Sequence, residues 1–373
     1  GAAGNDNISG GTGNDTFSFA ATGQLNADDT IDGGEGTDNL DVTTEVDLDS
    51  SSTASTSVTL TGIEGVDITL GADNLSFDAS GWTSLETLTF GSAANGCTPT
   101  VNNIRDGVVA TLGNLNIDDA TLDVATGASI TIDAEASIST LTITDAVNVT
   151  INGEGATADL EALALDATDT KTLTLTADGG TSLDTGSISN TDEITTITAT
   201  TTKSGGTITT GAGSATIADV DGLTTLNLSA TNANLTMGAM GTDATANNAE
   251  LLSSITATAT GTSVTLTTGT LYADSTVDST SDLDMTLNIT TNVGARNNIG
   301  AIDNTYGSIT STIVSHSDND TDIGNLTSVA QTHTVSGGGD TDFAAITASG
   351  AVTVTSTGSG DLTITDANID GTN

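Results

Sequence analysis

The first eighteen residues consist of two nine-residue units laid end to end, and this repeat constrains the fold more than any other feature of the chain. The units run from Gly1 to Ser9 and from Gly10 to Ser18, and Ala2 replaces the second glycine of the first copy. Glycines at the first, second and fourth positions allow backbone angles closed to other residues and turn carbonyl groups inward. The aspartate at the sixth position can complete an oxygen cage, and the apolar residue at the eighth buries a short strand.

A third copy of the unit follows an insertion and runs from Gly33 to Asp41. Such a cage, shared between stacked turns, suits Ca²⁺, which accepts six to eight oxygen ligands in irregular geometry. Mg²⁺ requires a tighter octahedron, and Zn²⁺ prefers His or Cys, of which the chain has only three in total. Several calcium ions are therefore the expected cofactors.

These units resemble the RTX family of calcium-binding, type I secreted proteins, whose nonapeptide is G-G-x-G-x-D-x-U-x with U apolar. The resemblance implies that turn carbonyls and the aspartates bind Ca²⁺ between turns on the same side of the coil. By position it makes Asp6, Asp15 and Asp38 the carboxylate ligands. It makes the turn-shaping glycines Gly1, Gly4, Gly10, Gly11, Gly13, Gly33, Gly34 and Gly36.

Two longer segments, Asp15–Leu40 and Phe77–Phe90, are similar to RTX-type bacterial surface-layer (S-layer) proteins and large related adhesins. In such proteins a Thr- and Ala-rich β-solenoid continues beyond the glycine repeats, and Ca²⁺ drives assembly of the lattice. The resemblance is specific over roughly residues 1–90 and only compositional beyond them.

The charge of the chain limits its partners. Its 49 acidic residues face four basic ones, for a formal net charge of −45. Self-repulsion on this scale opposes a compact state unless counter-ions bind, and it disfavours nucleic acid and anionic lipid as partners. A soluble acidic surface, as in salt-adapted proteins, is the alternative explanation. Calcium binding explains the many acidic residues better than a plain acidic surface does, because these residues recur beside glycine turns.

A looser apolar-x-x-apolar-x-apolar repeat begins at Ile63 and recurs at intervals of 22 to 34 residues up to Leu252, the range of one solenoid coil. Alternating segments with Thr between apolar residues indicate strands with one buried face. The sequence thus predicts an all-β fold, a parallel β-solenoid in which the RTX β-roll continues into an irregular Thr/Ala-rich β-helix; an antiparallel sandwich is the alternative. The expected segments are 1–45 (calcium-binding β-roll), 46–62 (junction) and 63–373 (β-solenoid and lattice-forming region).

Further acidic turns are candidate calcium sites, with solvated loops as the alternative. They comprise an acid-rich turn with Asp29 and Asp32, an alternating run with Asp318, Asp320 and Asp322, and a degenerate RTX turn with Asp340 and Asp342. The alternating run lacks the glutamate that an EF-hand has at its twelfth position.

No enzymatic motif is present, since the sequence has no H-E-x-x-H and no G-x-S-x-G. His316 and His333 are expected at the surface of Thr-rich strands. Repeated Thr-x-Thr patterns such as Thr172–Thr176 raise the possibility of an ice-binding face, but the irregular coil lengths predict that no regular threonine array forms.

The expected function is structural and not enzymatic: calcium-dependent folding and self-assembly into a bacterial surface layer, or alternatively an RTX adhesin stalk or surface filament. The expected location is the bacterial cell surface, and the expected partner is the chain itself, in a homo-oligomeric lattice or filament. A cell-surface polysaccharide, bound through a region outside this chain, is a further candidate partner. A secreted enzyme would need a catalytic domain elsewhere. No apolar run is long enough to insert in a membrane, and both ends are expected to be cuts through a longer polypeptide.

Overall fold

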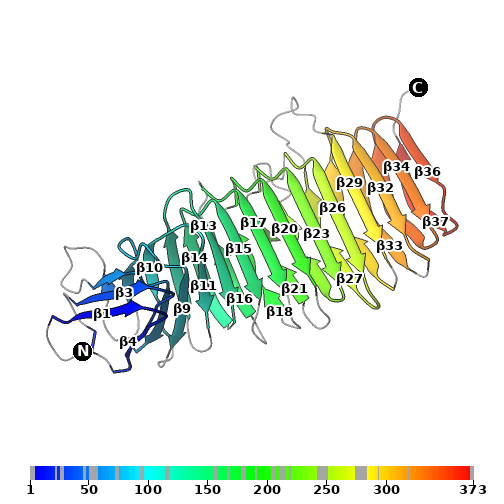
Figure 1. Ribbon diagram of the computed structural model, residues 1–373. Helices are drawn as coiled ribbons and strands as arrows, with labels where there is room; N and C mark the ends of the chain where they lie inside the picture. Colours follow the sequence, from blue (N-terminus) through cyan, green and yellow to red (C-terminus); the bar gives the residue numbers. More distant parts are fainter. Residues whose placement is uncertain are drawn as a thin grey trace. The chain divides into compact units, whose positions relative to one another are not determined.

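The computed structural model describes most of the chain, and every regular element in that part is a β-strand (Figure 1). The described residues are 5–21, 23–25, 29–44, 48–49, 58–71, 75–92, 96–113, 118–135, 137–153, 158–165, 169–177, 182–189, 191–202, 207–210, 216–217, 220–241, 251–273, 284–292, 294–317 and 319–369. They form two compact units, residues 1–170 and 171–373. Each unit is a parallel β-solenoid, as the sequence predicted.

Unit 1 has three parallel sheets. Its principal sheet has the order β2 (Thr16–Phe19), β4 (Asn39–Thr44), β7 (Gly65–Leu70), β9 (Thr87–Ser92), β11 (Val108–Leu112), β13 (Ser129–Ala134) and β15 (Asn148–Gly153). Its second sheet has the order β5 (Leu48–Asp49), β8 (Ser76–Asp78), β10 (Thr100–Ile104), β12 (Asp119–Val124), β14 (Ser137–Thr144) and β16 (Ala158–Ala164). A three-stranded sheet joins β1 (Asn7–Thr12), β3 (Thr30–Glu35) and β6 (Thr59–Thr61).

Unit 2 is built in the same way, from parallel sheets whose strands come from successive coils. Its principal sheet has the order β17 (Thr172–Ala177), β20 (Thr196–Thr201), β23 (Thr225–Thr231), β26 (Ser254–Thr260), β29 (Met285–Thr291), β32 (Ile309–Ser315), β34 (Gln331–Gly337) and β36 (Val352–Ser356).

The second sheet of unit 2 changes its strand pattern from coil to coil. In the earlier coils, each coil contributes two short strands to this sheet. The first of each pair are β18 (Ser182–Asp184), β21 (Thr207–Thr210), β24 (Asn234–Met237), β27 (Thr265–Thr268) and β30 (Arg296–Ile299). The others are β19 (Ser187–Ser189), β22 (Thr216–Ile217), β25 (Ala239–Met240), β28 (Leu271–Tyr272) and β31 (Ile302–Asn304). Both rows end on one long strand, β33 (Asp320–Ser328), which β35 (Asp340–Ala348) and β37 (Leu362–Ile369) follow.

Aliphatic side chains stacked from coil to coil form the core of each unit. In unit 1, Val66, Leu88 and Ala110 are successive partners in the principal sheet, and each is fully buried. In unit 2 the corresponding stack begins with Leu173 and Ile197. Because strands alternate inward and outward residues, the chain can build these thin layers with few aromatic residues.

Hydroxyl groups that directly precede strands of the unit 2 principal sheet connect successive coils by hydrogen bonds. The hydroxyl of Thr195 donates to the backbone oxygen of Lys171, that of Thr224 to Thr195, and that of Ser253 to Thr224, at 3.0 to 3.3 Å. Each bond joins equivalent positions of neighbouring coils. The strands therefore keep one register although the coils differ in length, and the extra residues lie between the strands.

The outward side of the unit 2 principal sheet carries an in-register array of small polar residues, which we call the threonine face. One row consists of Thr172, Thr196, Thr225, Ser254, Thr286, Thr310, Thr332 and Thr353, and the next of Thr174, Thr198, Asn227, Thr256, Asn288, Thr312, Thr334 and Thr355. The expectation that irregular coil lengths would prevent a regular array was wrong, because those lengths do not alter the register.

His333 is buried, contrary to the expectation of a surface position. It continues the inward stack in register with Ser311 and Val354. The Ser311 hydroxyl bonds to His333 Nδ1 at 2.7 Å, and His333 Nε2 bonds to Gln331 Oε1 at 2.8 Å. Its ring also packs against Phe343, with centroids 5.0 Å apart. These partners allow an imidazole to occupy an aliphatic position. The other histidine, His316, is exposed as expected.

Candidate metal centre

The glycine turns of the first two coils are stacked directly on each other. Gly11 lies near the end of β1 and Gly13 in the turn that follows, with φ of 105° and 111°. In the next coil Gly34 lies near the end of β3 and Gly36 in the turn that follows, with φ of 100° and 143°. Gly11 is the register partner of Gly34. Residues with a Cβ rarely adopt these angles, so the repeated glycines let both turns take one shape and stack.

A column of three carboxylates runs beside these turns, from Asp15 through Asp38 to Glu64, and we call it the acidic column. The amide of Asp15 donates to Asp38 Oδ1 at 2.7 Å, and the amide of Asp38 donates to Glu64 Oε2 at 2.7 Å. Each carboxylate of the next coil thus receives one hydrogen bond from the coil before. This use of one oxygen holds the other oxygen of Asp38 in a fixed direction.

The second oxygens of these aspartates are buried without a partner. Neither Asp15 Oδ2 nor Asp38 Oδ2 has a hydrogen-bond donor, although each is removed from solvent. The Asp38 side chain as a whole is only 1% exposed. An unpaired buried carboxylate oxygen is costly, and a bound cation would stabilise it.

Backbone carbonyl oxygens lie beside both of these unpartnered atoms. A Cβ placed on Gly10 would be 2.4 Å from Asp15 Oδ2 and 2.6 Å from the carbonyl oxygen of Gly33. A Cβ placed on Gly33 would be 2.4 Å from Asp38 Oδ2 and 2.1 Å from the carbonyl oxygen of Gly62. At each level a carboxylate and a carbonyl oxygen from the next coil therefore approach the same glycine. Because both are acceptors, they cannot bond to each other, and a cation between them would satisfy the two together.

The opposite turns hold a second, shorter column made of Asp6 and Asp29. The amide of Asp6 donates to Asp29 Oδ1 at 2.8 Å, and Asp6 Oδ2 is again buried without a partner. Asp29 is 1% exposed and has further interactions of its own. The structure thus brings Asp29 together with Asp6. Gly1 and Gly4, expected to shape this turn, lie outside the described residues.

Asp32 does not belong to either column. It is a half-buried residue of β3, in register with Ser9 and Thr61. Its side chain lies on the opposite face of β3 from that of Ile31, which points into the core.

The C-terminal acids lie in unit 2, where Asp320 pairs with Asp340 and Asp322 with Asp342 on neighbouring strands. Asp318 lies outside the described residues. Protein groups already bind the first pair, because Arg296 forms an ion pair with Asp320, and the amide of Asp361 donates to Asp340 Oδ1 at 2.9 Å. Burial raises the pKa of Asp322; Arg296 lowers it, and Asp342 and Asp320 raise it further.

Within the described part of the chain, no three His, Cys, Asp or Glu side chains gather as a metal-binding group. The acidic column differs from such a group because a carboxylate oxygen and a backbone carbonyl oxygen approach each of Gly10 and Gly33. Calcium accepts both kinds of oxygen. The residues present therefore fit Ca²⁺, and they fit a thiolate- or imidazole-bound metal poorly.

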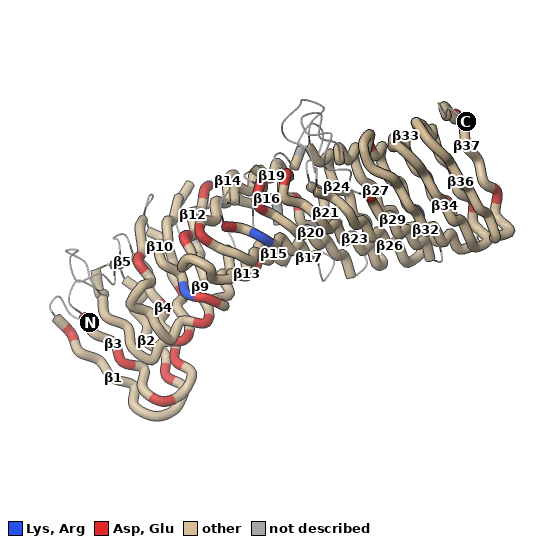
Figure 2. The backbone as a smooth tube through the Cα atoms, turned by 90° about the horizontal axis from the view of Figure 1, so that it is seen from above, with Lys and Arg blue, Asp and Glu red and all other residues tan. Residues whose placement is uncertain are grey.

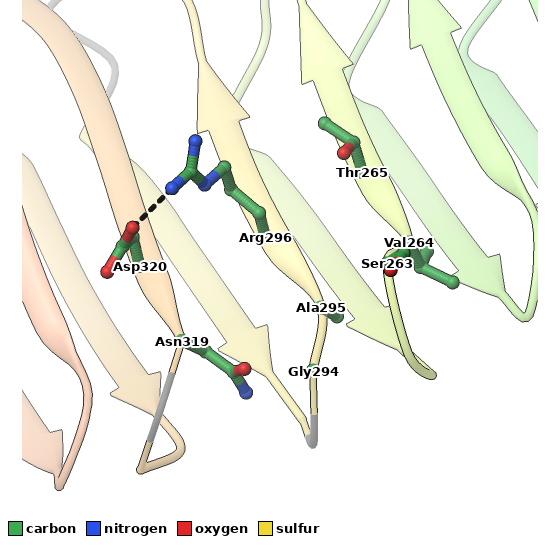
Figure 3. A pocket seen from close by; sticks show the side chains of 8 residues that line it. All are labelled: Ser263, Val264, Thr265, Gly294, Ala295, Arg296, Asn319 and Asp320. Atoms are coloured by element: carbon green, nitrogen blue, oxygen red, sulfur yellow. Dashed lines mark hydrogen bonds and ion pairs between the residues drawn. The ribbon is translucent and has the colours of Figure 1, made fainter.

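A groove of about 300 Å³ lies in unit 2, beside the ion pair of Arg296 and Asp320 (Figure 3). It is lined by Ser263, Val264, Thr265, Gly294, Ala295, Arg296, Asn319 and Asp320. Asn319 is 4% exposed, and neither amide atom has a partner. Its position, directly before β33, is the one that Ala295 has before β30, so an amide takes the place of an apolar residue.

Glu64 and Gly62 were missed by sequence reasoning. Gly62-Ile63-Glu64-Gly65-Val66 has the same glycine-x-acid-x-apolar spacing as Gly36-Thr37-Asp38-Asn39-Leu40. That spacing could have identified the third level of the acidic column, because glutamate can replace aspartate as an oxygen donor.

Comparison with known proteins adds no relative: no family model, no curated protein and no solved structure matches this chain. The described residues also contain no helix of the length and apolarity that crossing a membrane requires.

Proposed function

We propose that the chain is a calcium-dependent structural protein of the bacterial cell surface, whose N-terminal coils fold around several Ca²⁺ ions. One observation carries the calcium part of this proposal. Asp15 Oδ2 and Asp38 Oδ2 are buried, lack donors, and lie beside the carbonyl oxygens of Gly33 and Gly62. A cation at each level would convert an unfavourable arrangement into a favourable one.

Calcium is the cation that suits these donors best. It accepts carboxylate and carbonyl oxygens at about 2.3–2.6 Å and tolerates irregular coordination. Asp6 with Asp29, and Asp15 with Asp38 and Glu64, would supply the carboxylates, and the glycine turns would supply carbonyl groups. Of these, Asp6, Asp15 and Asp38 are the positions that the RTX nonapeptide assigns to calcium ligands in residues 1–45.

Calcium binding at these positions would be coupled to folding. A ligand that binds only the folded state stabilises it by about 2.7 kcal/mol for each site at a hundred times its Kd. Without calcium, self-repulsion within a chain of charge −45 opposes the coil. An unfolded chain in the low-calcium cytosol is suited to type I export, and folding would follow outside the cell.

The same charge argument supports assembly into a surface layer. Contact between the acidic surfaces of two copies of this chain would require bridging cations at the interface. The solenoid would serve as the repeating body of the sheet, with no catalytic role. A stalk or surface filament would share the fold and calcium dependence but would not form a two-dimensional lattice, and a surface polysaccharide remains the candidate anchor.

Electron microscopy of the purified chain with and without millimolar calcium tests this proposal. We expect ordered sheets with calcium only, and loss of order on chelation. Isolated rods or filaments in calcium would favour the stalk, and single particles under both conditions would contradict the lattice. Calorimetric titration of the same samples separates a failure to bind calcium from a failure to assemble.

A further inference from the structure

The threonine face of unit 2 contains no charged residue, although the chain carries 49 acidic side chains. Its eight strands, β17 to β36 of the principal sheet, have no Asp, Glu, Lys or Arg at any position. Figure 2 shows these strands in tan, with acidic residues elsewhere along the tube. A random distribution of so many acids would not leave such a face. A face without charge suits an uncharged partner best.

The two rows of the face form a regular lattice. Of the sixteen positions in the two rows, thirteen are threonine, two are asparagine and one is serine. Neighbouring strands lie about 4.8 Å apart, and successive outward residues of one strand lie about 6.7 Å apart. The β-branched side chain of threonine has few rotamers, so its methyl and hydroxyl groups repeat with the backbone. The face thus presents a periodic array rather than a pocket.

Each position of the array contributes little binding free energy by itself. These contributions add when all positions engage together, and this requires a partner that is itself periodic. Short side chains keep the face flat, and hydroxyl groups can bond to water at every lattice point. Ordering water from the liquid costs up to about 2 kcal/mol for each molecule. That cost is absent when the water already belongs to a crystal.

The other crystalline candidate, an insoluble polysaccharide, suits the face less well. Sugar rings present apolar faces that pack on aromatic side chains, which have a large flat surface. No Phe, Tyr or Trp occurs in these eight strands. We therefore propose that the threonine face of unit 2 binds the surface of ice. This proposal does not depend on the calcium sites of unit 1 or on lattice assembly.

Ice-affinity partitioning of the whole purified chain, in calcium-containing buffer, tests the proposal. Ice is grown slowly from the protein solution, and the protein fraction taken into the ice is compared with that of serum albumin. We expect enrichment of the wild-type chain in ice, and a return to the albumin level in the double variant Thr198→Tyr and Thr256→Tyr. Both side chains would project from the middle of the face.

The matched control is Thr267→Tyr, which changes a half-buried outward threonine of β27 in the second sheet of the same unit. It should partition as the wild type does. If the tyrosine pair alters the circular dichroism spectrum, Thr256→Lys, compared with Thr267→Lys, gives a smaller disturbance of the sheet. Exclusion of the wild type from ice would overturn the proposal, as would ice binding that survives both face variants. Sedimentation showing that the face variants only abolish a dimer, or binding to insoluble cellulose or chitin without binding to ice, would also overturn it.

Discussion

The backbone amide of Asp15 donates to Oδ1 of Asp38 in the next coil, and Oδ2 of each of these residues stays buried without a donor. One half of the carboxylate therefore fixes the stacking of the coils, and the other half is left for a cation. Because the amide and the carboxylate belong to successive coils, correct stacking and cation binding depend on each other.

Removing the charge of Asp38 should weaken calcium binding. Asp38→Asn keeps an oxygen for the amide of Asp15 but lowers the ligand charge, which sets calcium affinity. We expect the Kd measured by calorimetry to rise on the order of tenfold. Asp106→Asn removes the same charge from an exposed carboxylate of unit 1 that also accepts a hydrogen bond from an amide of the next coil, and should leave the Kd close to that of the wild type. Equal effects of the two changes would contradict the assignment.

Adding a methyl group at Gly33 should destabilise unit 1. The new Cβ would lie 2.1 Å from the carbonyl oxygen of Gly62 and 2.4 Å from Asp38 Oδ2, so the stacked turns would have to separate. We expect Gly33→Ala to cost about 1–3 kcal/mol in the free energy of unfolding, measured in urea with calcium. Gly91→Ala is the control, because no atom lies within 4 Å of its added Cβ. A neutral Gly33→Ala would show that the turns are not closely stacked.

Protonation of His333 should destabilise unit 2 in mild acid. Burial lowers its pKa from 6.5 to about 4, so the unfolded chain takes up this proton at higher pH than the folded chain does. The stability gained from neutral His333 is complete above pH 6.5 and is lost as the pH falls toward 4, by about 3 kcal/mol in total.

His333→Val isolates this contribution, because the many carboxylates titrate alike in both proteins. Between pH 6.5 and 4 the unfolding free energy of the wild type should fall more steeply than that of the variant. Parallel slopes for wild type and His333→Val would contradict a buried, neutral imidazole bonded to Ser311 and Gln331.

Replacing Asn319 should stabilise unit 2. Its amide is buried with neither atom bonded, and such a group costs about 1–3 kcal/mol. Asn319→Ala restores the residue type that Ala295 supplies one coil earlier, so the melting temperature should rise. The exposed Asn298→Ala should change it little. A lower melting temperature for Asn319→Ala would instead show that the amide has a bound partner in the groove.

The sequence predicted the solenoid but not its register. Apolar spacing around residues such as Leu226 and Ile255 reveals a coil, because each coil must bury one stripe of side chains. The spacing cannot show that Thr225 and Ser254 are partners, because the residues added between strands leave no signal in the pattern. That is why the threonine face emerged only from the strand pairing.

The candidate metal centre was also predicted in part. The nonapeptide identified Asp6, Asp15 and Asp38, since glycine turns constrain the sequence strongly. It did not show that Asp29 belongs beside Asp6, because the two residues are 23 positions apart in the sequence. The burial of His333 was invisible for a different reason: its hydrogen-bond partners come from another strand and from two residues away.

Anomalous diffraction from crystals grown with calcium tests the central claim most directly. We expect calcium peaks in the N-terminal coils, bonded to Asp15 Oδ2 with the carbonyl oxygen of Gly33 and to Asp38 Oδ2 with that of Gly62. A map in which these oxygens bond only to water or to protein donors, with no calcium beside them, would contradict the account.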